Sequence, residues 1–266
     1  MQITRAFRVL VTGVLGIFFA LSRSNFAAAQ PSMTLREGAV NATATLEIDA
    51  SEGAFGDVVS IAPDVSVGAT QDLTVSVIHS TVGRTGFRGS AGSGICVTDA
   101  CSHTYDNAGL EALYSLARGS LALAANAGVH ATSFDAGFYV AKLGAKARYT
   151  ANRLSITTLA SITIAATHRD DTPPNRDRLW LPIVFMYRVS GGLSLGVGTG
   201  LKAPFDDMSG SYEIALGGVA QYAVSPSLSF GASWVHGKLV GGDNVIPDDA
   251  SGLDYRAIQL WVSMTR

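Results

Sequence analysis

The chain has 266 residues, of which 47% are hydrophobic and 15% charged, and its formal net charge is −2. This length allows one large or two small domains. The slight acidic excess argues against nucleic acid as a partner, because phosphate binding needs a basic surface patch. Beyond residue 30 no window holds the 18 or more consecutive apolar residues of a spanning helix, which excludes a helical membrane protein.

The first segment has the three-part order of a secretory signal peptide. Arg5 and Arg8 form a basic region, an apolar run covers 9–21, and the alanines at 27–29 give an A-x-A cleavage site. The run is shorter than the roughly 20 apolar residues that a spanning helix needs. We therefore expect residues 1–29 to be a cleaved signal peptide and residues 30–266 to form one exported domain. Cleavage would leave 16 Lys and Arg against 21 Asp and Glu, a net charge of −5.

A recurrent strand start is the most informative feature of the exported domain. A tight turn, a leucine, a small residue and an apolar residue follow one another at 71–75, 119–123, 152–156, 191–195 and 226–230. After each of these, apolar and small or polar residues alternate, as Leu228 and Phe230 do with Ser229 and Gly231. A period of two marks a strand with two different faces.

Twelve strands are expected from this alternation. They cover 42–50, 57–67, 72–80, 108–117, 120–131, 137–149, 153–167, 178–189, 192–203, 211–223, 227–238 and 255–266. Strands of about ten residues are longer than those of most soluble sheets and suit a tilted membrane-spanning barrel. Tight turns also alternate with longer polar loops, of which 81–107, 168–177 and 241–254 are the longest. The sequence predicts an all-β, transmembrane, antiparallel up-and-down β-barrel with short periplasmic turns and long extracellular loops.

Aromatic residues near the strand ends fit two interfacial girdles of such a barrel. The tight-turn girdle would contain Tyr149, Tyr187 and Tyr222, and the loop girdle Tyr139, Trp180, Tyr212 and Trp234.

The signal peptide, the repeated strand starts and the terminal strand 255–266 resemble bacterial outer-membrane β-barrel proteins of the porin or transporter-like type. The resemblance covers almost the whole mature chain. It implies location in the bacterial outer membrane, contact with its lipid and lipopolysaccharide, and assembly by the barrel insertion machinery. One departure is that such proteins usually end on an aromatic residue that this machinery reads, whereas this chain ends on Arg266. Either Trp261 serves instead, or the chain inserts less efficiently.

The alternation assigns ten charged residues to the lumen. They are Lys142, Lys146, Arg148, Arg188 and Lys202, with Glu47, Asp49, Asp64, Glu111 and Glu213. Basic and acidic walls that face each other would create a transverse field and orient polar solutes. Alternatively, the same residues pair as salt bridges, because an unpaired charge in a narrow interior is costly. Small inner residues such as Gly196 and Gly231 are expected to leave a narrow lumen unfilled.

Cys96 and Cys101 are the only cysteines, and in an exported chain we expect them to form one local disulfide at the tip of a long loop. Two cysteines do not make a structural zinc site, and the histidines lack metal-ligand spacing. We expect no metal and no cofactor. His130 and Thr132 are the nearest match to the His and Ser pair of lipid-hydrolysing barrels, but the alternation turns His130 inward, and Thr132 is a poorer nucleophile than serine.

The leading expectation is therefore a passive channel or transporter for small solutes, without enzymatic activity. A closed structural or surface-interaction barrel that acts through its outer loops is the alternative, and an outer-membrane lipid hydrolase is a third possibility. The solute, the oligomeric state and the openness of the lumen are left open.

Overall fold

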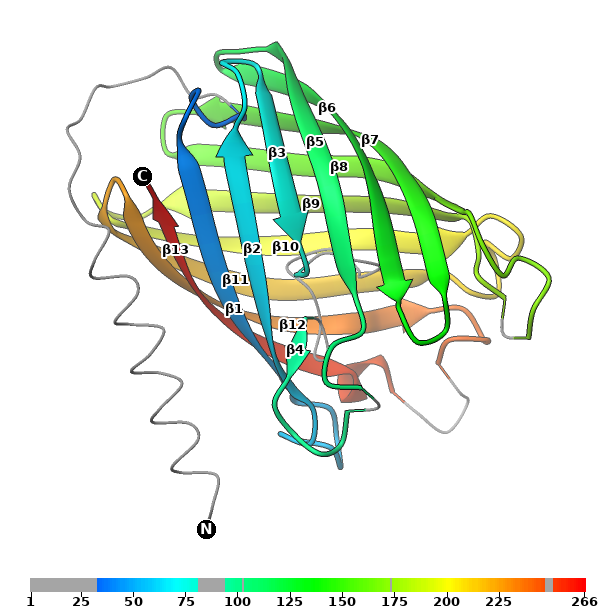
Figure 1. The fold of residues 1–266 in the computed structure, drawn as a ribbon. Coiled ribbons are helices and arrows are strands. Elements are labelled where there is room, and N and C mark those ends of the chain that lie inside the picture. The colour runs from blue at the N-terminus through cyan, green and yellow to red at the C-terminus, as the bar shows by residue number, and fades with distance from the viewer. Residues whose placement is uncertain (1–32, 81–93, 102, 173, 247–250) are drawn as a thin grey trace.

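The computed structural model describes residues 33–80, 94–101, 103–172, 174–246 and 251–266. The expected signal peptide 1–29 lies outside these residues. Long antiparallel strands form nearly all of the fold (Figure 1). The strands are β1 Val40–Asp49, β2 Val59–Gly68, β3 Leu73–Ile78, β4 Ile95–Cys96, β5 Ala108–Ala117, β6 Leu121–Ser133, β7 Phe138–Ala151, β8 Leu154–Ala165, β9 Arg178–Arg188, β10 Leu193–Pro204, β11 Glu213–Ser225, β12 Leu228–Gly241 and β13 Arg256–Thr265, with a short 3-10 helix η1 at Gly252–Asp254.

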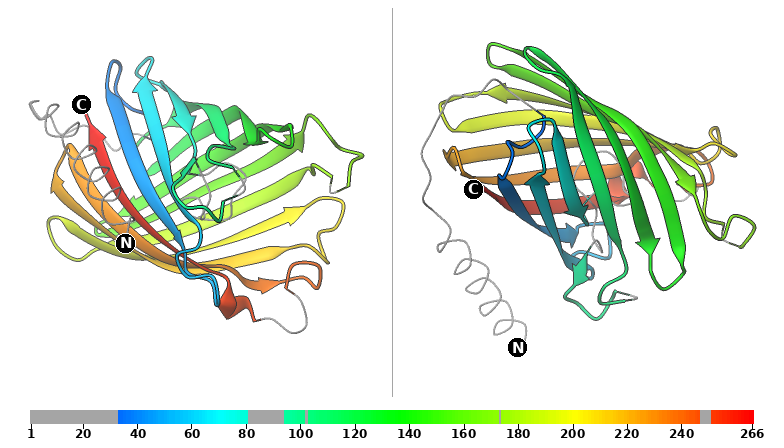
Figure 2. Two further views of the ribbon diagram at one scale, coloured as in Figure 1. Left: turned by 60° about the horizontal axis from the view of Figure 1, so that its bottom comes forward. Right: turned by 45° about the horizontal axis from the view of Figure 1, so that its top comes forward.

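The sheet closes into a barrel. From β5 to β13 each strand pairs antiparallel with the next, and β13 pairs with β1 from Asn41 opposite Thr265 to Asp49 opposite Ala257. Twelve long strands make the wall and β4 is a short addition, so the predicted all-β barrel and its strand count are confirmed. Figure 2 shows the closed wall from two further directions. Within the described residues, no helix is long and apolar enough to cross a membrane.

The connections between strands differ in length between the two ends of the barrel. At one end, here called the short-turn end, strands are joined by 69–72, 118–120, 152–153, 189–192 and 226–227. The first and last strands also start and finish there, where Val40 N donates to the Arg266 carbonyl. At the other end, the long-loop end, the connections are 50–58, 79–107, 134–137, 166–177, 205–212 and 242–255.

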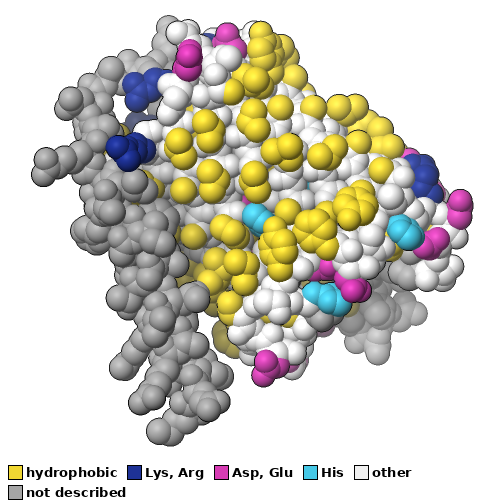
Figure 3. All heavy atoms as spheres, viewed as in Figure 1, with side chains coloured by type: hydrophobic (Ala, Val, Ile, Leu, Met, Phe, Trp, Pro, Cys, Tyr) yellow, Lys and Arg dark blue, Asp and Glu magenta, His cyan; other side chains and the backbone are white. Residues whose placement is uncertain are grey.

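The outer face of the wall is apolar. On β6, Leu121, Leu123 and Val129 are exposed, whereas Ala122 and Ala124, which alternate with them, are fully buried. Figure 3 shows hydrophobic side chains spread across the barrel wall, with charged side chains gathered near its ends. A contiguous apolar band of this size is unusual on a water-soluble monomer. It is the arrangement by which a barrel meets lipid.

One position in the wall is filled by two separate stretches of chain. β3 pairs with only one half of β2, from Val77 opposite Val65 to Thr74 opposite Gly68. The half of β2 toward the long-loop end therefore has no pairing with β3. There β4 takes its place, with Cys96 opposite Ser60 on β2. On its other edge β4 bridges to Tyr105. The alternation did not predict β4, since two residues are too few to show a period.

Trp180 departs from the predicted girdles. It is 6% exposed and packs inside the barrel, whereas Trp234 is 41% exposed. Trp261, a candidate for the terminal aromatic signal, is also buried, so its ring is not presented on the outer face.

Candidate functional site

A cluster of buried polar residues lies on the inner side of β5, β6 and β7, near the middle of these strands. Glu111 Oε1 lies 2.7 Å from Lys142 Nζ and 2.9 Å from His130 Nε2. Asn126 Nδ2 donates to Glu111 Oε2 at 2.9 Å. Lys142 is 1% exposed and His130 2%. A carboxylate that accepts from a lysine and an amide, with a histidine alongside, is a well-compensated buried charge.

Strand register and one glycine bring this cluster together. Glu111 on β5 lies opposite Gly128 on β6, and Gly128 lies opposite Lys142 on β7. A Cβ at Gly128 would be 2.8 Å from Glu111 Cγ. The absence of a side chain on the middle strand therefore lets the carboxylate and the ammonium meet across it. Lys142 Nζ also lies 4.9 Å from the centroid of the Trp180 ring, a cation–π contact.

The cluster lies between two cavities. The first, the long-loop cavity, has a volume of about 30 Å³ and is lined by His130, Lys142, Thr163, Arg178, Trp180 and Lys202, among others. The second, the short-turn cavity, has a volume of about 230 Å³, and Glu111, Asn126 and Lys146 are among its lining residues. His130 and Lys142 thus face one cavity, whereas Glu111 and Asn126 face the other.

Two more of the expected charged residues pair with each other. Lys202 on β10 lies directly opposite Glu213 on β11, and Lys202 Nζ is 3.4 Å from Glu213 Oε2. The pairing alternative therefore describes the contacts of Glu111, Lys142, Lys202 and Glu213.

The acidic residues of β1 and β2 lie outside the central cluster. Glu47 is fully buried and accepts from Ser60 Oγ at 3.3 Å. Asp49 accepts from Ser51 N, and Asp64 accepts from the backbone amides of His79 and Ser80. The last two carboxylates therefore help to hold connections at the ends of their strands.

The remaining basic residues are spread along the strands. Lys146 and Arg148 are half-buried on β7. Arg188 is exposed and lies opposite Ser194 at the short-turn end. The structure does not bring these three into the central cluster.

Two glycines that were expected to leave space are covered by large side chains, and this expectation was wrong. A Cβ at Gly196 would overlap Met186 on β9. A Cβ at Gly231 would overlap the indole ring of Trp261, which lies opposite on β13. These glycines make room for neighbouring side chains and do not leave the volume empty.

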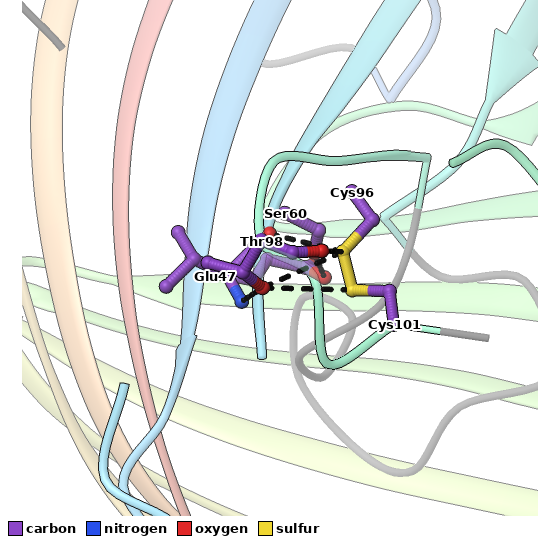
Figure 4. The surroundings of a disulfide bond; sticks show 6 residues. Glu47, Ser60, Cys96, Thr98 and Cys101 are labelled. Carbon is purple, nitrogen blue, oxygen red and sulfur yellow. Dashed lines mark hydrogen bonds between the residues drawn. A yellow bond between two sulfur atoms is a disulfide. The ribbon is translucent and has the colours of Figure 1, made fainter. Parts of the chain in front are cut away.

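Cys96 and Cys101 form the predicted disulfide. It does not lie at a loop tip, because Cys96 belongs to β4 and is 7% exposed. Figure 4 shows it beside Glu47, Ser60 and Thr98. Cys96 N donates to the Thr104 carbonyl at 2.8 Å, so the disulfide closes a small loop whose two arms pair with each other. It therefore stabilises the stretch that replaces β3.

Replacing both cysteines with serine is expected to lower the free energy of unfolding. Chain entropy for so short a loop gives a loss of about 2 kcal/mol. Urea unfolding of the refolded protein in lipid vesicles measures it. Reductant should cause the same loss in the original protein and none in Cys96→Ser/Cys101→Ser; a reductant effect in the double variant would contradict this origin.

An ion pair and several hydrogen bonds hold the connection 166–177 in place. Arg169 forms a bidentate ion pair with Asp177, with contacts of 2.8 and 2.9 Å, and Asp177 also accepts from Ala165 N. The Arg169 hydrogen bond and charge hold the pKa of Asp177 below its usual range. Asn175 Nδ2 donates to the Tyr139 and Thr167 carbonyls.

Arg176 and Arg178 line the long-loop cavity, although neither was among the charged residues that the alternation assigned to the lumen. Arg178 has the same phase on β9 as Trp180. Arg188, which the alternation assigned to the lumen, has this phase too, so the same assignment extended along β9 would have found Arg178.

Asp177→Ala is expected to loosen the 166–177 connection. Amide hydrogens of this segment should exchange faster, because both the ion pair with Arg169 and the Ala165 contact are lost. Because the Asp177 pKa is lowered, the anchoring is present above the ordinary aspartate pKa and is lost as the pH falls through the lowered value. Asp171→Ala is the matched control, because Asp171 lies in the same connection and its ion-pair partner, His168, is exposed. Equal exchange in the two variants would contradict the role of Asp177.

The segment just before β1 narrows the short-turn end of the interior. Leu35 N donates to Thr74 Oγ1 at 2.8 Å, and Met33 and Leu35 line the short-turn cavity. A Cβ at Gly68 would overlap the Arg36 carbonyl, so this glycine permits the close approach.

The position of His130 tests its match to the histidine of lipid-hydrolysing barrels. His130 is inside the barrel against Glu111, as its alternation predicted, and not on the outer face where lipid would lie. No group of three or more His, Cys, Asp or Glu residues suited to a metal ion occurs within the described part of the chain.

A closed antiparallel barrel with an apolar outer face and a polar interior is a transmembrane β-barrel. Its fold is that of the porins: a structure of the porin NanC superposes with a TM-score of 0.61 at 11% identity, over 84% of this chain and 98% of that chain.

Two weaker similarities are to Salmonella typhi OmpF in complex with daunomycin and to Acinetobacter baumannii outer membrane protein Omp33. OmpF has a TM-score of 0.43 at 9% identity, over 85% of this chain and 97% of that chain. Omp33 has a TM-score of 0.44 at 15% identity, over 86% of this chain and 98% of that chain. At these identities the likeness shows the fold alone. No protein-family model matches the chain, and no curated protein matches it.

Proposed function

We propose that this protein is an outer-membrane channel that passes small polar solutes. The observation that carries the proposal is the pair of cavities with charged and polar side chains in their lining, one toward each end of a closed barrel, with the Glu111–Lys142 cluster between them. In a barrel with an apolar outer face, such an interior is the available polar route between the two sides of the membrane. The cluster is then the constriction, and the charged residues of the interior set selectivity. Export by the signal peptide, insertion by the barrel machinery and contact with lipopolysaccharide belong to this proposal.

Conductance of the refolded residues 30–266 in a planar bilayer tests the proposal. Stepwise currents are the expected result, and under a salt gradient the reversal potential gives the sign of the preferred ion. Silence from protein that circular dichroism shows to be folded would contradict a channel.

A closed barrel that acts through its outer loops is the second candidate. The near-complete burial of Lys142 and the packing of Trp261 over Gly231 favour it, because both fill the interior. Silence in the bilayer would support this candidate.

A further inference from the structure

The long-loop cavity is lined by four cationic side chains. They are Lys142, Arg176, Arg178 and Lys202, and no Asp or Glu is among the described residues that line this cavity. This one-sided charge sets it apart from the short-turn cavity, whose lining holds both Glu111 and Lys146.

Strand register places two of these cations around a short hydroxyl side chain. Thr163 on β8 lies opposite Lys142 on β7 and opposite Arg178 on β9. Neighbouring strands are about 4.8 Å apart, so the two long side chains rise on either side of a short one. Lys202 on β10 lies opposite Trp180, two residues along β9 from Arg178. The four strands β7 to β10 thus form a recess with a hydroxyl at its floor and cations at its sides.

Carboxylates outside the cavity lining contact three of the four cations. Glu111 contacts Lys142, Glu213 contacts Lys202, and Asp206 lies 3.5 Å from Arg176. Each of these three carboxylates fixes the position of one cation at the edge of the recess. Planar guanidinium groups bind carboxylate and phosphate through two parallel hydrogen bonds, and hydroxyl and ammonium donors add to this.

We propose that the long-loop cavity binds small solutes through a carboxylate or phosphate group, with the oxyanion over Thr163 between Lys142 and Arg178. The proposal rests on the proposed channel function and names the class of solute. The site lies on the long-loop side of the constriction, where it would hold an anionic solute before passage. Arg178 supplies the bidentate contact.

Block of chloride current by inorganic phosphate tests the site. Phosphate added to the long-loop side should reduce the current of the original protein in a saturable way, and glucose should not. Arg178→Gln should weaken the apparent affinity by roughly tenfold or more, because it removes a charge-assisted hydrogen bond. Thr163→Val should weaken it less, because a neutral hydroxyl donates a weaker bond.

Two matched controls lie on the same strands. Arg188→Gln changes an arginine at the other end of β9, outside the cavity lining. Thr157→Val changes a threonine of β8 that lies opposite Arg148 and Val184, so only one cation flanks it. Both should leave phosphate block unchanged. If either weakened it as much as its partner variant, the effect would be one of general charge or stability, and the site would be overturned.

Calorimetric titration of phosphate into the refolded protein separates this inference from the channel. Saturable binding that Arg178→Gln weakens supports the site even if no current is seen, and in that case only the channel falls. Currents without block and without saturable binding overturn the site and leave the channel standing.

Discussion

Glu111→Gln is expected to lower the free energy of unfolding by roughly 3–5 kcal/mol, the cost of leaving a buried charge without its partner. The substitution keeps the shape of the side chain but leaves the Lys142 ammonium, 1% exposed, without a countercharge. Urea unfolding in lipid vesicles, followed by tryptophan fluorescence, measures the loss. Combining it with Lys142→Met should restore most of the stability, because the second change removes the uncompensated charge.

Glu213→Gln is the matched control for this experiment. Its partner Lys202 is also a lysine on a neighbouring strand, but the two side chains are 17% and 19% exposed. Water can reach this pair, so the loss should be about 1 kcal/mol or less. Equal losses in the two variants would show that the central cluster is no drier than the Lys202 pair, and would remove it as the constriction.

Trp261→Ala is expected to lower the free energy of unfolding by roughly 3–5 kcal/mol, as for other buried tryptophans. Its ring covers Gly231 across the β12–β13 pair, and no alanine side chain can fill that space. The same change removes bulk from the interior, so single-channel conductance should rise. Trp234→Ala, on the outer face, is the control and should leave conductance unchanged. A conductance that Trp261→Ala does not change would show that the ring lies off the solute path.

The fold could be predicted from the sequence because each strand of a barrel has one face toward lipid and one toward the interior. That requirement produces an alternation of two kinds of residue in strands such as β6, where exposed and buried residues alternate over most of the strand. The prediction that Trp180 belongs to the loop girdle was wrong. Trp180 has the same phase on β9 as Arg188, which was assigned to the lumen, but the apolar run Leu179, Trp180, Leu181 and Pro182 covers both faces and hides this phase.

The contacts of the site could be predicted only in part. Alternation placed Glu111 and Lys142 on the inner face, but their meeting depends on the register of β5 and β7 against β6, which a single strand does not encode. The glycines were misread, because a small residue marks either an empty space or room for a neighbour. Gly231 makes room for a neighbour, the ring of Trp261. Trp261 alternates on β13 in step with the polar Gln259 and Ser263, which indicates that its side chain points to the interior.

The shared wall position of β3 and β4 gives the barrel a second seam, in addition to the β1–β13 closure. Elsewhere in the wall, neighbouring strands are continuous with each other through a single connection, and a folding hairpin can zip from its turn. Residues 79–94 connect β3 to β4, and this loop must close before the two residues of β4 can pair with β2. Loop closure costs conformational entropy, and the short pairing of β4 with β2 offsets this cost with few hydrogen bonds. Local opening should therefore begin where β4 pairs with β2, and the Cys96–Cys101 bond would keep the two arms of the small loop together when β4 separates from β2.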